Sequence, residues 1–344
     1  MGNSCPCCRK ADDLADENKP VQKITIINER WQVHRQLGKG GCGKVYEVYD
    51  ITDNNKPYAM KTEAVKNTET GRLPQEEKVI SLIHEKGHGR HVTELLDRGM
   101  LQMDPRRPPT QFIVMTLLGP SLADLRKLCR NKRMAPGTTA LLAIQMLESV
   151  EDIHNCGYIH RDIKPGNYML GAGPRRHVVY IIDFGMARKY VDEDGKLLPI
   201  RKDNVRFRGT FRYAASETHK NVEYGRQHDL YCLLHTLAEM RMGELPWQEF
   251  EGDPTATYEL KHKIIPTRWL SGVEPQYLAF YEHLTSLHYD IKPGYEILRG
   301  LFKDVLKNLK MTTGSPFEWE PNGENYHRFV KEELSRLFRD DIKT

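Results

Sequence analysis

A short polar stretch near the middle of the chain carries the residues best suited to chemistry. His160-Arg161-Asp162-Ile163-Lys164-Pro165-Gly166-Asn167 places an Asp, a Lys two positions later and an Asn five positions later in one predicted loop. Such a loop can gather a base, a cation and an amide oxygen around one point. The predicted strand Tyr180-Ile181-Ile182 then delivers Asp183 into a Phe-Gly turn. This second carboxylate argues against the alternative, a plain polar surface turn.

A glycine-rich segment nearer the N-terminus is the second candidate for a functional site. Its residues are Leu37, Gly38, Lys39, Gly40, Gly41, Cys42, Gly43, Lys44 and Val45. Glycines lack a Cβ, so backbone N–H groups in such a loop can approach a polyphosphate. Alone, the motif fits a glycine-rich hairpin turn equally well. It lies between two predicted strands, which does not suit a dinucleotide-binding fold, and no GxxxxGK[ST] motif is present, which excludes a P-loop NTPase.

A lysine and a glutamate complete the set of candidates. The predicted strand Tyr58-Ala59-Met60 ends at Lys61, and a predicted helix begins with Glu76 and Glu77. Glu76 has apolar residues three, four and seven positions later, so it shares the inward face of that helix. We therefore predict a Lys61–Glu76 ion pair, with Glu77 as the second candidate partner. Alone, Lys61 would be read as a solvated lysine at a sheet edge.

The elements that must position these residues change in character at about residue 118. Strand patterns precede it, at residues 31–33, 45–49, 58–60 and 112–115, together with the helix over 76–83. Helical periodicity follows it, at residues 121–129, 138–154, 229–241, 275–287 and 295–309. We predict an α+β fold of two lobes, a small β-rich N-lobe over 31–117 and a larger helical C-lobe over 118–321. The cleft between two such lobes is a natural ligand site.

Composition narrows the class of protein further. The 344 residues carry a net charge of +4, too mild to indicate nucleic-acid binding. No stretch of the sequence is apolar enough for a membrane span or a secretory signal. The seven cysteines are an odd number, and without secretion we expect reduced thiols. We therefore expect a cytoplasmic protein.

The four motifs, in this order and in these secondary-structure contexts, resemble the signature set of protein kinases over residues 31–321. Within the kinases, the chain is similar to the casein kinase 1 superfamily, and most closely to its tau-tubulin kinase branch. The residues that carry this resemblance are Leu117–Leu122, Phe207–Ala214, His228–Leu230, Leu245–Trp247, Tyr289–Tyr295 and Pro316–Trp319.

The resemblance implies a bilobal kinase fold, ATP and Mg²⁺ as cofactors, and a role for each candidate. The glycine-rich segment covers the ATP phosphates, and Lys61, fixed by Glu76, holds two of them. Asn167 and Asp183 bind Mg²⁺, whose preferred ligands are oxygens. Asp162 accepts the proton of the substrate hydroxyl, and Lys164 neutralises the γ-phosphate. The adenine lies against the backbone near Leu118, with Met115 behind it.

The resemblance also indicates the acceptor. Lys164, two positions after Asp162, and Thr210 follow the Ser/Thr-kinase arrangement, so protein substrates with Ser or Thr acceptors are expected. The segment between Gly185 and Thr210 contains no Ser or Thr, and Tyr190 is its only hydroxyl. Arg161 could pair with an added phosphate. We nevertheless expect activity without phosphorylation of this segment.

A basic run follows in the same segment. From residue 196 to 212 there is one acid, Asp203, against the basic residues Lys196, Arg201, Lys202, Arg206, Arg208 and Arg212. The run is either a solvated charged surface or a site that favours acidic or phosphorylated substrates. Arg212 matches an anion-binding arginine of casein kinase 1. The second family lysine has no clear counterpart, since Thr255 falls near its place, and this puts a strict need for a phosphorylated substrate in doubt.

Both ends of the chain leave alternatives open. Residues 1–30 are a predicted disordered leader, in which Gly2 begins a myristoylation-like sequence and Cys5, Cys7 and Cys8 could be palmitoylated. Such acylation would give peripheral membrane attachment; the alternative is an ordinary leader. Residues 322–344 form a predicted helical extension, with a helix over 326–342. Its apolar side, Phe329, Val330, Leu334, Leu337 and Phe338, is expected to dock on the large lobe in preference to binding a partner.

One rival interpretation comes from a different class of protein. A pseudokinase would keep the fold as a scaffold that binds nucleotide or partners without turnover. Cys42, which replaces the aromatic usually found at the tip of the glycine loop, is a mild hint in its favour. Intact Lys61, Asp162, Asn167 and Asp183 argue against it. We expect an active kinase that is a monomer.

Overall fold

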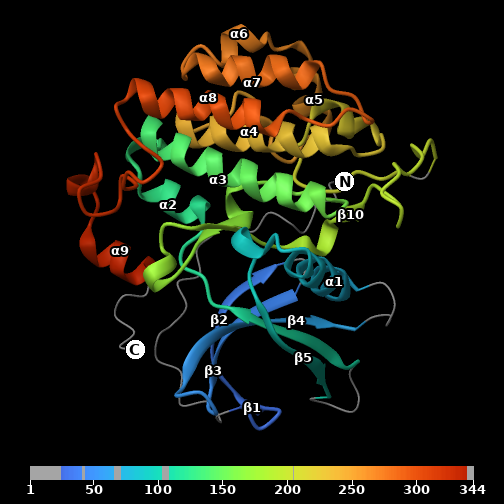
Figure 1. The fold of residues 1–344 in the computed structure, drawn as a ribbon, viewed down its shortest axis with the longest axis vertical. Coiled ribbons are helices and arrows are strands. Elements are labelled where there is room, and N and C mark those ends of the chain that lie inside the picture. Colours follow the sequence, from blue (N-terminus) through green and yellow to red (C-terminus); the bar gives the residue numbers. More distant parts are fainter. Residues whose placement is uncertain (1–24, 41–42, 66–70, 103–107, 204, 339–344) are drawn as a thin grey trace, which may run out of the picture.

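The computed structural model describes residues 25–40, 43–65, 71–102, 108–203 and 205–338. Within these ranges the chain forms two lobes, a smaller one built on a sheet and a larger one built of helices (Figure 1). The α+β fold predicted from the sequence is confirmed.

The small lobe contains a six-stranded antiparallel sheet in the order β1-β2-β3-β4-β6-β5. Its strands are β1 (Ile26–Ile27), β2 (Trp31–Gly40), β3 (Gly43–Asp50), β4 (Lys56–Ala64), β5 (Leu95–Leu101) and β6 (Thr110–Thr116). Strands β2 and β3 form a hairpin in which Gly40 pairs with Gly43, so the glycine-rich segment is the end of a hairpin. Its tip, Gly41 and Cys42, lies outside the described residues.

The alternation of side chains along β4 decides where Lys61 lies. Tyr58 and Met60 are buried with Trp31 on one face of the sheet. Ala59 is buried on the other face, in a cluster with Leu73 of α1 (Arg72–Glu85). Successive side chains of a strand point to opposite faces, so Lys61 shares the face of Ala59 and is directed toward α1.

Helix α1 begins four residues before the predicted start at Glu76. The backbone N–H of Leu73 donates to Glu63 Oε2 at 2.8 Å, so a side chain from β4 satisfies an N–H group in the first turn. Pro74 lies in that turn, where its missing N–H costs nothing. The periodicity of the later residues could not reveal this start, because the partner of Leu73 comes from another element.

The large lobe is built around helices. These are α2 (Leu122–Leu128), α3 (Pro136–Asn155), α4 (Arg226–Met242), α5 (Pro254–Lys263), α6 (Pro266–Trp269), α7 (Pro275–Thr285), α8 (Tyr295–Asn308) and α9 (Lys331–Phe338). Four short strands form two ladders near the cleft, β7 (Tyr158–Ile159) with β10 (Arg188–Lys189), and β8 (Tyr168–Leu170) with β9 (Val179–Ile181). Among the described residues, no helix has the length and apolar character that crossing a bilayer requires.

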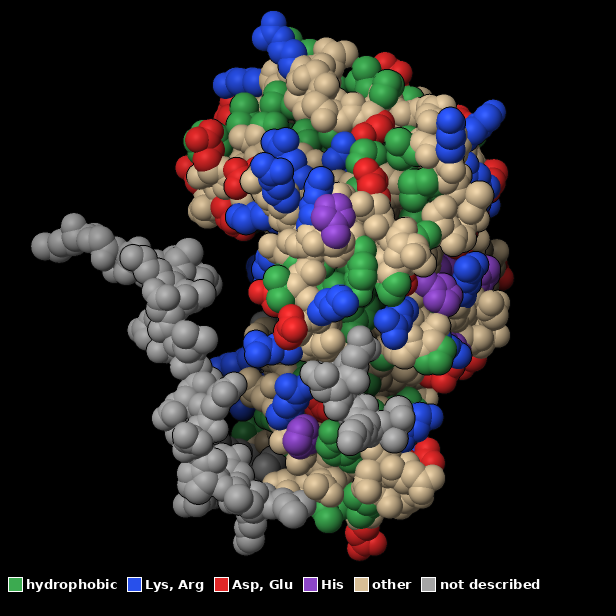
Figure 2. All heavy atoms as spheres, turned by 90° about the vertical axis from the view of Figure 1, so that its left-hand side faces the viewer, with side chains coloured by type: hydrophobic (Ala, Val, Ile, Leu, Met, Phe, Trp, Pro, Cys, Tyr) green, Lys and Arg blue, Asp and Glu red, His purple; other side chains and the backbone are tan. Residues whose placement is uncertain are grey.

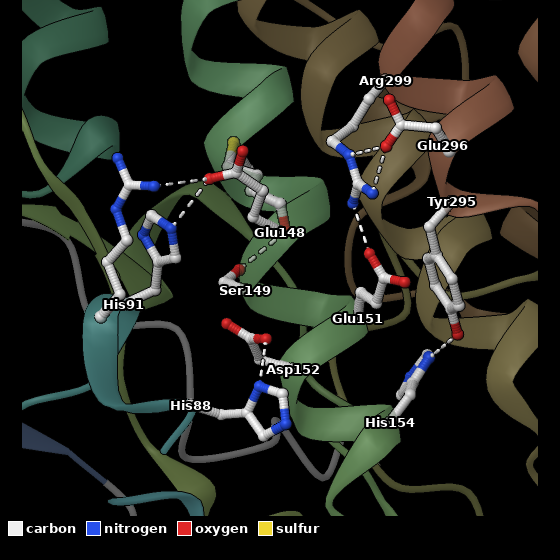
Figure 3. Close-up of polar contacts among 12 residues, drawn as sticks. His88, His91, Glu148, Ser149, Glu151, Asp152, His154, Tyr295, Glu296 and Arg299 are labelled. Atoms are coloured by element: carbon white, nitrogen blue, oxygen red, sulfur yellow. Dashed lines mark hydrogen bonds and ion pairs between the residues drawn. The ribbon is translucent and has the colours of Figure 1, made fainter.

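Two histidines that follow α1 connect the small lobe to the large one. His88 Nδ1 lies 2.7 Å from Asp152 Oδ1, and His91 Nε2 lies 3.1 Å from Glu148 Oε2; both carboxylates belong to α3 (Figure 3). His91 is almost completely buried. The segment that leads from α1 to β5 is therefore held on the large lobe, which fixes one end of the helix that carries Glu76.

The N-terminal boundary differs from the prediction. Residues 25–30 belong to the fold, not to a disordered leader: Ile26 pairs with Gln32, and Ile27 is buried in the sheet core. Arg30 Nη2 lies 2.7 Å from Asp50 Oδ2, which adds an ion pair to this short strand connection. The leader prediction is wrong for these residues. Residues 1–24, with Gly2, Cys5, Cys7 and Cys8, lie outside the described part of the chain.

The C-terminal segment docks on the large lobe, as expected. Phe329, Leu334 and Phe338 are buried in its main core. The predicted single helix over 326–342 is wrong at its start, because Tyr326–Arg328 form a 3₁₀ turn and Phe329 is extended before α9 begins at Lys331. Val330 is 52% exposed and does not share the apolar side. Residues 339–344 lie outside the described residues.

Candidate active site

Lys61 is the centre of a buried ionic group between the lobes. Its ammonium pairs with Glu76 Oε2 of α1 and donates to Asp183 Oδ1 at 3.0 Å. Burial by itself would lower the pKa of Lys61, but the carboxylates of Glu76 and Asp183 outweigh it and raise the pKa. The predicted Lys61–Glu76 pair is therefore present. Glu77, the second candidate, pairs with Arg98 instead.

The loop that follows β7 holds the candidate base in a closed set of polar contacts. Asp162 Oδ2 accepts from Lys164 Nζ at 2.7 Å, and Asp162 Oδ1 accepts from Thr210 Oγ1 at 2.7 Å. Lys164 Nζ also donates to Thr210 Oγ1 at 3.2 Å. The side-chain amide of Asn167 donates to the backbone oxygen of Asp162 at 2.8 Å. The structure thus brings together four residues that the sequence placed in two separate segments.

An aspartate of α4 anchors this loop from behind. Asp229 Oδ2 accepts from the backbone N–H of His160 at 2.6 Å, and its Oδ1 accepts from the N–H of Arg161 at 2.8 Å. His154 Nε2 lies 3.0 Å from the same carboxylate. Burial would raise the pKa of Asp229, but its contact with His154 prevails and lowers it. In the sequence, Asp229 stands out only as part of a family motif, and this role was not predicted. A signal that could have indicated it is a carboxylate followed by the apolar residues Leu230, Cys232 and Leu233 within a predicted helix.

Asp183 adopts a left-handed backbone conformation, with φ 68° and ψ 68°. Such a conformation is costly for a residue other than glycine and is typical of functional sites. The next residue holds it, because Phe184 is fully buried and its ring meets the His160 ring edge-on at 5.3 Å. Burial would raise the pKa of Asp183, but the Lys61 ammonium outweighs burial and lowers it, so the carboxylate remains ionised.

Two glycines let the backbone approach closely around these groups. At Gly43 (φ +117°) a Cβ would lie 2.0 Å from Thr62 O, and at Gly209 (φ +119°) it would lie 2.4 Å from Arg161 O. Any other residue would push the hairpin away from β4, or the segment before Thr210 away from the catalytic loop. By contrast, a Cβ at Gly38 or Gly40 would meet nothing within 4 Å, so the backbone there borders open space.

A cleft of about 810 Å³ between the lobes contains nearly all of the described candidates. Those that line it are Leu37, Gly38, Lys39, Gly40, Gly43, Val45, Lys61, Glu76, Leu118, Asp162, Lys164, Asn167 and Asp183. Lys44, which is exposed on β3, does not line the cleft. Met115, expected behind the adenine, and the adjacent Leu117 are part of the lining. One part of the cleft is therefore apolar and the other is charged.

The residues present fit Mg·ATP. The apolar part, with Val45, Ala59 and Met115, suits a purine ring, and the open backbone beside Gly38 and Gly40 leaves room for phosphates. Asn167 uses its amide nitrogen toward Asp162, which leaves its amide oxygen for a cation. Together with the ionised carboxylate of Asp183, this oxygen is a hard donor of the kind that Mg²⁺ prefers.

The segment between Asp183 and Thr210 is held without a phosphate. Tyr190, which carries the only side-chain hydroxyl between these two residues, is buried and donates to His154 O at 2.7 Å. Arg161, the predicted partner for an added phosphate, donates through Nε to Met186 O at 2.7 Å. Burial, followed by the charge of Arg188, lowers the pKa of Arg161 to about 10.

Arg212 is less available for an anion than its family match implied. Its guanidinium lies 3.1 Å from Glu239 Oε1 and also pairs with Glu251. Both carboxylates come from residues far along the chain, so the sequence run gave no sign of them. Of the other predicted basic residues, Arg201 pairs with Glu223, whereas Lys196, Lys202, Arg206 and Arg208 are exposed.

Among the lining residues that were not predicted from the sequence, two come from the C-terminal helix. Arg336 and Leu337 of α9 border the cleft, although they lie more than 150 residues after Asp183 in the chain. The periodicity of Leu334, Leu337 and Phe338 predicted that this segment docks on the large lobe. It carried no information about which part of that lobe the segment would meet.

The fold and this site together define a protein kinase. The family model described as "Protein kinase domain" matches residues 31–296, and the chain belongs to this family.

Two curated relatives support the same family. The chain is 33% identical over 297 residues to a probable serine/threonine-protein kinase of Dictyostelium discoideum, a match that covers 86% of this chain and 57% of that protein. It is 32% identical over 313 residues to a putative serine/threonine-protein kinase of Caenorhabditis elegans, with 90% and 86% covered. The chain thus spans a little over half the length of the Dictyostelium protein and most of the nematode one.

Proposed function

We propose that this chain is a protein serine/threonine kinase that transfers the γ-phosphoryl group of ATP to Ser or Thr hydroxyls of protein substrates. The observation that carries the proposal is the arrangement of Asp162, Lys164 and Thr210 within 2.7–3.2 Å of one another, in the same cleft as the Lys61–Asp183 contact. A cation, a base and a carboxylate for metal binding thereby face one space.

Each side chain has a defined task in this reaction. Mg·ATP, when bound, supplies the phosphoryl group and the divalent charge that stabilises it. Lys61 binds the phosphates as a protonated amine that Glu76 and Asp183 keep in place. Asp162 accepts the hydroxyl proton of the acceptor and orients its oxygen, and Lys164 stabilises the negative charge that develops nearby. Thr210 connects the substrate-facing segment to this base.

Within the kinases, we place the chain with the casein kinase 1 superfamily and nearest its tau-tubulin branch. The support is the motif set around Phe207–Ala214 and Leu245–Trp247. In the structure these two segments meet, because Trp247 Nε1 donates to Arg212 O at 2.7 Å. Thr210, Arg212 and Trp247 border a small hollow of about 260 Å³ beside Thr257.

We further propose that the preferred substrates are acidic or already phosphorylated. Lys202, Arg206 and Arg208 are exposed on the segment that leads to Thr210, and no ion pair engages them among the described residues. Cations placed there favour an anionic peptide. Because Glu239 and Glu251 already engage Arg212, this preference rests on the exposed residues and does not require a phosphorylated substrate.

A peptide-array phosphorylation assay with purified protein tests both proposals. Acidic and phosphorylated Ser/Thr peptides should react faster than neutral ones, and peptides with Tyr as the only acceptor should not react. The double variant Arg206→Ala/Arg208→Ala should lose this preference, whereas Lys307→Ala, an exposed lysine of α8, should keep it. Absence of turnover on every peptide, with nucleotide binding intact, would favour the pseudokinase alternative.

Membrane attachment remains a separate proposal, because Gly2, Cys5, Cys7 and Cys8 lie outside the described residues. If the leader is doubly acylated, a membrane fraction should retain the protein, and Gly2→Ala should release it. A wholly soluble protein with unmodified Gly2 by mass spectrometry would contradict the proposal and leave a cytoplasmic kinase.

A further inference from the structure

Helix α9 packs against the large lobe. Leu334 and Phe338, one helical turn apart, are both buried in the core that also contains Leu122 and Leu125 of α2. Helix α2 begins directly after Ser121, which lies at the edge of the cleft. In Figure 1, α9 lies at the level where the two lobes meet. Helix α9 therefore packs on the same core as α2, the helix that starts beside the nucleotide cleft.

In this position, two residues of α9 line the cleft. Leu337, half-buried, packs against the core of the large lobe and lines the cleft together with Leu37 and Gly38 of β2. Arg336 lines the cleft as well, and the same lining includes Ser121 and Asp124 of the large lobe. In Figure 2, which turns this side of the molecule to the viewer, Lys and Arg side chains lie around the junction of the lobes.

The chemistry of the two residues differs and is complementary to a nucleotide. Leu337 offers apolar surface to the cleft, whose lining also includes Leu37, Val45 and Met115. Arg336 is exposed, and no hydrogen bond or ion pair engages it within the part of the chain that the structure describes. Asp124 of α2, an acid of the cleft lining, already accepts from Ser121 Oγ at 2.6 Å and pairs with Lys127 at 2.8 Å. The guanidinium therefore remains available to an anionic ligand.

The helix lies beyond the domain that the family shares. The match to the protein kinase domain ends at residue 296, and α9 begins at Lys331. The catalytic groups described above all lie inside the matched range. If α9 contributes to the cleft, this chain adds to the shared site a helix that the family model does not include.

We propose that α9 forms a wall of the nucleotide site, in which Leu337 contacts the nucleoside of bound ATP or ADP and Arg336 attracts its phosphates. The proposal rests on the assigned kinase function, because it takes the cleft to be the ATP site. It makes the segment after the shared domain a determinant of nucleotide affinity. The catalytic step itself, at Asp162 and Lys164, is left unchanged.

Direct binding to the full chain tests this proposal by calorimetry with Mg·ADP and, separately, with adenosine. Leu337→Ala should weaken both ligands by a similar factor, about fivefold, because it removes contact with the nucleoside. Arg336→Ala should weaken Mg·ADP by about threefold to fivefold and adenosine hardly at all, and added salt should reduce the difference. In kinase assays, the KM for ATP should rise while kcat stays the same.

Matched controls come from the same segment. Lys331→Ala removes one exposed positive charge of α9, and Val330→Ala removes an exposed apolar side chain just before it; neither residue lines the cleft. Both should bind Mg·ADP as the wild type does. Because Arg336 is exposed, its replacement tests the proposal even if Leu337→Ala loosens the helix.

Two outcomes would overturn the proposal in distinguishable ways. Wild-type affinity for Mg·ADP in both the Arg336 and Leu337 variants would remove α9 from the site and leave the kinase assignment standing. Failure of the wild-type chain itself to bind Mg·ADP would contradict the kinase assignment, and the proposal with it.

Discussion

Glu223 accepts a hydrogen bond from Arg201 Nη2 at 3.1 Å and thereby holds the segment between Asp183 and Thr210 against the start of α4. The same carboxylate lies 3.3 Å from Arg188 Nε of β10. One side chain, 7% exposed, therefore connects two arginines thirteen positions apart on this segment. Burial would raise the pKa of Glu223, but these arginines outweigh burial and lower the pKa, so the carboxylate of Glu223 is charged at neutral pH. Glu223 thus places a negative charge between two arginines, which is the kind of contact that a phosphate added to such a segment makes.

The first prediction is activity without phosphorylation of this segment. Protein treated with phosphatase should still phosphorylate an acidic Ser/Thr substrate, because residues 186–209 contain no Ser or Thr and the Tyr190 hydroxyl is buried. Glu223→Gln should lower turnover about tenfold, since each arginine loses its charged partner. Glu193→Gln is the control, because Glu193 makes an exposed ion pair with Lys189 on the same segment. Activity that returned only with a phosphate mapped to residues 186–209 would contradict the prediction.

The second prediction separates the two aspartates of the cleft. Asp183→Asn should abolish Mg²⁺-dependent ATP binding, because it removes the ionised carboxylate beside Lys61. Asp162→Asn should leave nucleotide binding largely intact. Both variants should lose turnover by orders of magnitude, because charge stabilisation and orientation each contribute several kcal/mol. Calorimetry with and without Mg²⁺, beside a turnover assay, distinguishes the roles; a near wild-type rate for Asp162→Asn would show that another group serves as the base.

The third prediction uses the two neighbouring glutamates of α1. Glu76→Gln should lower kcat/KM by about 10- to 100-fold, because the buried Lys61 loses a charged hydrogen-bond partner. Glu77→Gln should have little effect, since Glu77 pairs with Arg98 near the surface. The pair of variants changes the same chemical group one position apart. Equal losses in both would indicate that α1 itself, and not the contact with Lys61, determines the rate.

Local spacing explains what the sequence could predict of the site. Asp162, Lys164 and Asn167 lie within six residues, and the alternation along β4 directs Lys61 toward α1, so their neighbourhood is encoded over short distances. The strand and helix patterns likewise predicted two lobes. Partners that come from distant segments were not predictable. Asp229 accepts a hydrogen bond from the His160 N–H although 69 residues separate the two in the chain. Nothing in the sequence indicates that they lie close together in the fold.

The same limit applies to surfaces. The run that ends at Arg212 is predominantly basic in sequence, yet Glu239 and Glu251, from later segments of the chain, neutralise that arginine. The strand β1 is only two residues long, too short for a period to be recognised, and the pairing of Ile27 with Trp31 stabilises it. Both the pairing of Arg212 and the formation of β1 depend on residues from another segment. Neither could be predicted, because periodicity describes only the segment in which it occurs.

The fourth prediction concerns stability in acid and rests on two histidines beneath the segment after Thr210. Burial lowers the pKa of His235 to about 3 and the pKa of His219 to about 4, from the ordinary 6.5. The Lys261 ammonium disfavours a second charge at both sites, and His235 lies against the Trp247 ring at 4.9 Å. In the unfolded chain both imidazoles take up protons near pH 6.5, which the folded chain resists. Stability from these groups is therefore fully present above pH 6.5 and is lost as the pH falls below it.

The size of this effect can be isolated at His235. One histidine of this kind changes the free energy of unfolding by about 1.4 kcal/mol per pH unit, or about 2 kcal/mol between pH 6.5 and 5. His235 Nδ1 lies 2.7 Å from Tyr213 O, and an Asn side chain can supply that donor without titrating. Denaturant unfolding of wild type and His235→Asn at pH 7 and pH 5 should show a smaller acid-induced loss in the variant, whatever its stability at pH 7. His327→Asn, which changes an exposed histidine, should lose as much as the wild type. An identical loss in His235→Asn would mean that carboxylate protonation elsewhere, and not this buried imidazole, makes the fold sensitive to acid.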